Sequence, residues 1–148
     1  MQKTTKMSSI FFENNTEHPI DLGLVQQIAS NLTTKEIELI FTTNEEMQEI
    51  NLNTRGKDSS TDVLSFPYDE MPHTPLGSIV ISADFVVEKS KLYNHSFQDE
   101  FTLLFIHGIL HLLGYDHEVD NGEHRDKEEE LILKYNLPKS LIIRTIEE

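Results

Sequence analysis

Three histidines in the segment HGILHLLGYDH, residues 107–117, have the spacing of ligands to a single metal ion. His107 and His111 are four residues apart, so on an α-helix they lie one turn apart on the same face and both rings can reach one ion. On a continued helix, His117 would lie about 9 Å farther along the axis. Because zinc binds imidazole nitrogen at about 2.0–2.1 Å, the helix must end after His111 and return the chain toward the metal.

The residues around His117 support such a turn. Gly114 follows the last leucine of the segment, where helices commonly end in a left-handed glycine. Asp116 is expected to accept a hydrogen bond from the N–H of a ligand imidazole. Three neutral imidazoles leave Zn²⁺ an open fourth position, which is typical of catalytic sites, and water bound there has a pKa of about 7. The sequence therefore predicts one Zn²⁺ per chain, held by His107, His111 and His117.

This spacing resembles the H-E-x-x-H-x-x-G-x-x-H signature of the metzincin metalloproteases, with one difference. Gly108 stands where those enzymes have the glutamate that deprotonates the water and protonates the amine leaving group. Peptide hydrolysis is therefore disfavoured. Cleavage of a phosphodiester requires stabilisation of negative charge on phosphate oxygens, which a metal and a guanidinium can provide. Asp62 or Asp116 could assist as a base, and the sequence does not choose between them.

The elements that must position these residues indicate an α+β domain spanning residues 1–148. The segment from Ser96 to Leu113 is apolar nearly all round, which predicts a buried helix. Asp21, Thr43 and Ser82 are expected to begin other helices. Periodicity predicts about five helices, over residues 21–32, 43–54, 83–94, 96–114 and 121–137. It also predicts a mixed sheet of about four strands, over residues 7–15, 35–43, 62–68 and 76–82, after a short polar tail.

Composition limits the class of protein. The chain has no cysteine, which excludes disulfides and thiolate metal sites and agrees with a reducing cytoplasm. It opens without a signal peptide, and its longest apolar run is too short to span a bilayer, so we expect a cytoplasmic protein without a membrane partner. The 12 Lys and Arg against 26 Asp and Glu give a net charge of −14. This charge argues against nucleic acid as a partner, unless a metal and a few cations in one cleft bind a phosphate.

The remaining candidate residues have weaker signals. Arg55 is the only arginine before position 125, and it lies in a polar loop segment, where most arginines are solvated. Its spacing alone would not single it out. The other four histidines lie in predicted loops or on a charged helix and are expected at the surface: His18, His73, His95 and His124.

Four segments resemble blocks of the YbeY family, bacterial single-domain endoribonucleases that act as rRNA maturation factors. HGILHLLGYDH resembles the family signature and NLNTRGKDSSTDVLSFPY its Arg-Gly block. LGSIVIS resembles the third block and KEEELIL the C-terminal one. The family usually has an acid after Leu-Gly in the third block, where this chain has Ser78. We expect this difference to leave the metal site intact.

The resemblance implies a zinc-dependent, single-strand-specific endoribonuclease of the cytoplasm. Its substrate would be rRNA rather than DNA, notably the 3′ end of 16S rRNA, with a further role in ribosome quality control. By position, His107, His111 and His117 would bind the zinc. Arg55 would be the catalytic or phosphate-holding arginine.

Two alternatives remain open. The chain could be a non-catalytic ribosome-assembly protein with a structural metal, because an acidic surface suits basic ribosomal proteins of the small subunit. It could instead be a metallopeptidase, against which Gly108 is the argument.

Overall fold

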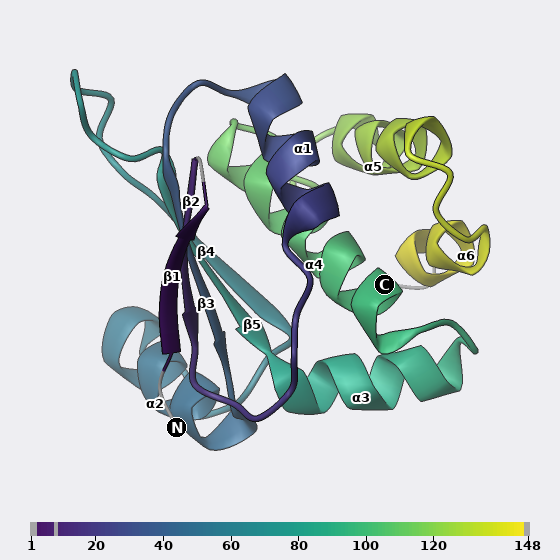
Figure 1. The fold of residues 1–148 in the computed structure, drawn as a ribbon, viewed down its shortest axis with the longest axis horizontal. Coiled ribbons are helices and arrows are strands. Elements are labelled where there is room, and N and C mark those ends of the chain that lie inside the picture. The colour runs from purple at the N-terminus through teal and green to yellow at the C-terminus, as the bar shows by residue number, and fades with distance from the viewer. Residues whose placement is uncertain (1–2, 8, 147–148) are drawn as a thin grey trace.

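The core of the protein is one mixed sheet with helices on both faces (Figure 1). The computed structural model describes residues 3–7 and 9–146. Its strands are β1 (Lys3–Met7), β2 (Ile10–Asn14), β3 (Ile37–Thr42), β4 (Val63–Pro67) and β5 (Gly77–Ser82), in the order β1-β2-β3-β5-β4. The three inner strands β2, β3 and β5 run parallel, and each edge strand is antiparallel to its neighbour. The predicted α+β class and mixed sheet are confirmed.

The sheet has one strand more than predicted. Residues 3–6, predicted as a polar tail, form β1 together with Met7, and β1 pairs antiparallel with β2 from Lys3 opposite Asn14 to Met7 opposite Ile10. An edge strand is held by its main-chain hydrogen bonds to one neighbour. A polar segment can therefore form a strand that hydrophobic periodicity does not reveal.

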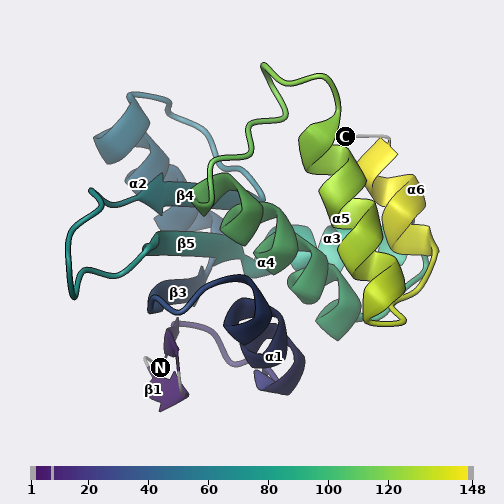
Figure 2. The ribbon, with the colours of Figure 1, turned by 90° about the horizontal axis from the view of Figure 1, so that it is seen from above.

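The described residues form six helices, which lie in unequal layers. They are α1 (Gly23–Leu32), α2 (Asn44–Arg55), α3 (Ala83–Leu92), α4 (Phe97–Leu112), α5 (Glu123–Lys134) and α6 (Ser140–Ile146). Helix α2 covers one face of the sheet. Helices α1, α3 and α4 cover the other, with α5 and α6 beyond α4 (Figures 1 and 2). Among residues 3–7 and 9–146, no helix has both the length and the apolar character needed to cross a bilayer.

Helix α6 was not predicted, because Pro138 marks the end of the preceding helix and seven residues are too few for a clear periodic pattern. It is held by tertiary contacts. Leu141 is fully buried in a cluster with Leu103 of α4 and Ile132 of α5. Arg144, also on α6, is buried beside acidic partners.

Two of the three predicted capping residues, Thr43 and Ser82, cap their helices, whereas the N-cap position of α1 is Leu22, which makes no side-chain cap hydrogen bond. The Thr43 hydroxyl accepts the N–H of Glu46 at the start of α2, and the Ser82 hydroxyl accepts the N–H of Phe85 in α3. Asp21 Oδ1 accepts the N–H of Gly23, the first residue of α1.

Helix α4 is the central helix, lying between the sheet and α5, and it carries two of the predicted metal ligands. Nearly all of its side chains from Glu100 to Leu112 are buried, as its composition predicts. It packs tightly on the sheet at Gly108, where an added Cβ would lie 2.8 Å from Cγ2 of Ile79 on β5. Glycine at this position therefore brings α4, and the histidine beside it, close to the sheet.

Candidate metal centre

The chain reverses immediately after α4, as the spacing of the histidines requires. Gly114 has φ +103°, a left-handed conformation that glycine adopts readily. The N–H of Gly114 donates to the carbonyl of His111 at 3.0 Å, and the N–H of Tyr115 donates to the carbonyl of Leu110 at 3.0 Å. The turn returns His117 to α4, where its ring centroid is 4.9 Å from that of His107.

A third histidine completes a cluster with these two. Potential ligand atoms of His107, His117 and His124 all lie within 4.8 Å of one another. His124 comes from the first turn of α5, and its ring centroid is 4.5 Å from that of His107 and 5.3 Å from that of His117. The prediction that His124 lies at the surface is wrong, because its exposed fraction is 0%. Its helix is rich in charge, so no apolar stripe indicates which face is buried.

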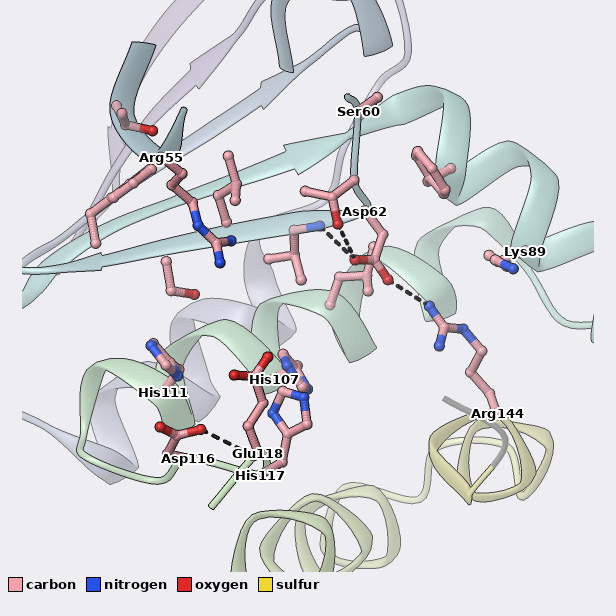
Figure 3. A pocket seen from close by; sticks show the side chains of 18 of the residues that line it. Arg55, Ser60, Asp62, Lys89, His107, His111, Asp116, His117, Glu118 and Arg144 are labelled. Carbon is pink, nitrogen blue, oxygen red and sulfur yellow. Dashed lines mark hydrogen bonds and ion pairs between the residues drawn. The ribbon is translucent and has the colours of Figure 1, made fainter. Parts of the chain in front are cut away.

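His111 lines the same pocket as His107 and His117. Within the described residues it is not part of the three-histidine cluster. Figure 3 shows its side chain set apart from the other two, on the side of Asp116. The structure thus brings two of the three predicted ligands together and places the third on the wall of their common pocket.

The carboxylate at the cluster is Glu128, which the sequence did not single out. Its Oε1 lies 3.2 Å from Nδ1 of His107 and 3.4 Å from Nε2 of His124. A hydrogen bond at Nδ1 orients the ring of His107 and favours the tautomer in which Nε2 carries the lone pair. The sequence feature that could have indicated Glu128 is its i, i+4 spacing from His124 on the same helix. Asp116, expected in this role, instead accepts the backbone N–H of Glu118 at 3.0 Å.

The residues of the cluster fit a metal ion. Burial, reinforced by the neighbouring His107, lowers the pKa of His124 to about 4, although Glu128 opposes the shift. The ring is therefore neutral near pH 7, which metal binding requires. Among the described residues, neither ring nitrogen of His124 has a hydrogen-bond partner, and neither does Oε2 of Glu128. Buried polar atoms without partners are uncommon, and a bound cation would satisfy imidazole nitrogens of this kind.

Gly108 faces away from this cluster. Because an added Cβ there would meet Ile79 of β5, a glutamate at position 108 would enter the packed interface between α4 and the sheet. The position that supplies the general base in metzincins is therefore unavailable for that purpose here. The structure strengthens the argument against a peptidase.

A cavity of about 880 Å³ opens over the histidines. Its cationic lining residues are Arg55, Lys89 and Arg144. Arg55 is the last residue of α2, and Figure 3 shows its guanidinium pointing into the space that the histidines border. Across the cavity, Arg144 binds Asp62 with 3.0 Å between Nη2 and Oδ2. Because Arg144 is paired with acids, the cation best placed to meet a phosphate beside the histidines is Arg55.

Ser78 lies on the opposite face of the sheet. It precedes by two residues Val80, which packs with Met47 of α2, and alternate residues of a strand share a face. In the register of β3 and β5 it lies opposite Glu38. The difference from the family pattern at Ser78 is therefore remote from the histidines.

Two of the remaining histidines are exposed as predicted, and one is not. His18 and His73 are exposed. The side chain of His95 is buried, with Nε2 2.6 Å from Glu100 Oε1 and Nδ1 2.9 Å from the hydroxyl of Ser140. Its surface prediction is wrong, because α6 covers the loop in which it lies.

Comparison with known proteins supports the resemblance. The model of the family described as Endoribonuclease YbeY matches residues 1–136. An Endoribonuclease YbeY of Aliarcobacter butzleri is 62% identical over 137 residues, covering 91% of this chain and 98% of that protein. Another Endoribonuclease YbeY, from Sulfurimonas denitrificans, is 59% identical over 136 residues, covering 92% of this chain and 98% of that protein. A solution structure of a Thermotoga maritima protein matches this chain with a TM-score of 0.54 and 29% sequence identity. The match covers 79% of this chain and 75% of the Thermotoga chain.

Proposed function

Since the chain belongs to the endoribonuclease YbeY family, we propose that residues 1–148 form one metal-dependent hydrolase domain that cleaves single-stranded RNA. The observation that carries the proposal is the position of Arg55, whose guanidinium faces the histidine cluster across one cavity. Such a cavity suits a phosphodiester, whose charge increases in the transition state.

We assign the metal to His107, His111 and His117, the three histidines of the signature segment. Three imidazoles and no cysteine suit Zn²⁺, at one ion per chain, although Ni²⁺ and Cu²⁺ also bind imidazole. When bound, the ion would supply Lewis acidity and a hydroxide at neutral pH. Glu128 holds the ring of His107 in position. The turn at Gly114 returns His117 to the cavity.

Arg55 would hold the scissile phosphate. A guanidinium donates two parallel hydrogen bonds to phosphate oxygens, which fixes their orientation and stabilises the added negative charge. Asp62 is poorly placed as a base, because Oδ1 accepts the N–H of Val63 at 2.8 Å and Oδ2 binds Arg144. Asp116 lines the cavity next to His117 and is the better candidate for a proton acceptor.

We propose maturation of the 3′ end of 16S rRNA and ribosome quality control in the cytoplasm, with RNA rather than DNA as substrate. The net charge of −14 opposes tight RNA binding outside the pocket. Basic ribosomal proteins of the small subunit would therefore deliver the RNA, because their charge complements the surface of this chain.

The test combines zinc content with cleavage of a labelled single-stranded rRNA fragment. Wild type should hold about one zinc and cleave. Arg55→Ala should keep the zinc and lose about 10²–10³-fold in rate, the usual effect of removing one transition-state donor. His111→Ala should lose both the bound zinc and the cleavage activity. Lys57→Ala is the matched control, because this nearby cation is exposed and, in the described chain, does not line the cavity.

Two outcomes would contradict the proposal. Loss of zinc in folded Arg55→Ala protein would refute the role given to Arg55. Zinc bound without cleavage, in wild type and variants alike, would favour the ribosome-assembly protein with a structural metal.

A further inference from the structure

We propose that His124 is a fourth imidazole ligand of the metal centre, supplied by α5 in addition to the histidines of the signature segment. This inference rests on the metal site of the proposed function. The signature histidines all come from α4 and the turn after it. His124 belongs to a different helix and approaches the site from a different side. It was predicted as a surface residue, and nothing in the spacing of the signature points to it.

The first observation is the position of its nitrogens. Potential ligand atoms of His107, His117 and His124 lie within 4.8 Å of one another. Nitrogens that share one tetrahedral zinc at about 2.0–2.1 Å are roughly 3.3 Å apart. The cluster therefore needs to contract by about 1.5 Å at most, which small rotations of the side chains can provide.

The second observation is that the buried ring of His124 makes no ring-nitrogen hydrogen bond within the described residues, although its Nε2 has a 3.4 Å ion-pair contact with Glu128 Oε1. The exposed fraction of His124 is 0%. A histidine that only fills the core is expected to bond at least one ring nitrogen, as His95 does at both of its own. Packing of the His124 ring on His107, at an interplanar angle of 27°, explains its burial but not the absence of a hydrogen bond at its ring nitrogens.

The third observation is the carboxylate that His107 and His124 share. Glu128 Oε1 lies 3.2 Å from a ring nitrogen of His107 and 3.4 Å from one of His124. Carboxylates that contact metal-binding histidines orient the rings and increase their basicity. One buried acid thus serves a ligand on α4 and a ligand on α5, and it fixes the two helices relative to each other at the metal.

The added ligand is compatible with catalysis and should affect metal retention. Some catalytic zinc sites expand to five ligands during reaction, so a fourth imidazole does not by itself prevent access of substrate. A site built on two helices also releases its ion only when α5 moves from α4. We therefore expect tighter binding and slower exchange than three histidines would give.

The test is zinc-edge X-ray absorption of the zinc-loaded full chain, with zinc affinity measured by chelator competition. Wild type should fit four imidazoles, and His124→Leu should fit three. The dissociation constant should rise about 10- to 100-fold in the variant, at least the effect known for outer-shell partners. His73→Leu is the matched control, because this histidine is exposed. Its spectrum and affinity should equal those of wild type.

Stability of the metal-free protein separates a ligand from a residue that only fills the core. A ligand whose ring nitrogens make no hydrogen bond in the metal-free protein should be replaceable by leucine without loss of stability in that state. Replacement of a residue that only fills the core should instead lower the stability of the metal-free protein. The wild-type spectrum remains decisive even if the variant fails to fold.

Three imidazoles in wild type, with unchanged affinity in His124→Leu, would overturn the fourth ligand and leave the metal-dependent nuclease intact. Failure of wild type to bind zinc would instead overturn the proposed metal centre itself.

Discussion

Replacement of Arg144 by methionine should destabilise the protein strongly, because this residue joins α6 to two acids. Its side chain is 4% exposed, with Nε 3.2 Å from Oε2 of Glu100 and Nη2 3.0 Å from Oδ2 of Asp62. Glu100 is fully buried, and its other oxygen contacts His95 at 2.6 Å. Methionine keeps much of the volume and removes the charge.

The magnitude follows from the two contacts. Breaking a buried ion pair by removing one partner costs about 3–5 kcal/mol, because the other charge remains buried. The side chain of Asp62 is 28% exposed and is rehydrated when Arg144 is removed, so loss of this second ion pair adds about 1 kcal/mol or less to the destabilisation. His95 still pairs with Glu100, which places the estimate near the low end, at about 3 kcal/mol. For a chain of this size, the corresponding fall in melting temperature is about 6–12 °C.

Urea unfolding of the wild type, Arg144→Met and the double variant Arg144→Met/Glu100→Gln would measure the effect. The double variant should recover at least half of the loss, since it no longer buries an uncompensated carboxylate. Arg125→Met is the control, because Arg125 is exposed on α5. A loss below about 1 kcal/mol in Arg144→Met, or no recovery in the double variant, would refute the reasoning.

Three further substitutions or conditions test the site. Gly108→Ala should destabilise the protein by about 1–2 kcal/mol in urea unfolding. The added Cβ would lie 2.8 Å from Cγ2 of Ile79, and the cost of this overlap exceeds the gain in helix propensity from glycine to alanine. Equal or greater stability would contradict the close packing. Burial lowers the pKa of His124 to about 4, so the unfolded chain binds more protons below pH 6.5, and metal-free protein should lose stability as the pH falls from 6.5 to 4. The loss should be on the order of 1–2 kcal/mol by pH 5, allowing for water in the open pocket, and His124→Leu should lose less. Glu128→Gln should weaken zinc binding about 10- to 100-fold in chelator competition, whereas Asp116→Asn should not.

Local patterns in the sequence determined much of the site. The apolar composition of residues 96–113 predicts a buried helix, and α4 is that helix. The spacing of His107 and His117 predicts a reversal at Gly114, which has the expected positive φ. Residues that cap helices, such as Thr43, act within a few residues of their own position. These features depend on neighbours in the chain, so they can be read without knowledge of the fold. The family resemblance then drew attention to Arg55, which spacing alone did not.

Tertiary structure decided the features that join distant segments. His124 and Glu128 lie at the histidine cluster only because α5 packs against α4, and a helix rich in charge has no apolar stripe to indicate its buried face. Arg144 reaches Asp62 across 82 positions of sequence, through a helix too short to be predicted from periodicity. β1 is held by main-chain pairing, which side-chain patterns do not encode. Spacing along the chain identifies ligands on one helix and the turn that follows. Ligands and ion pairs contributed by a second helix depend on which faces meet, and packing of the whole chain decides that.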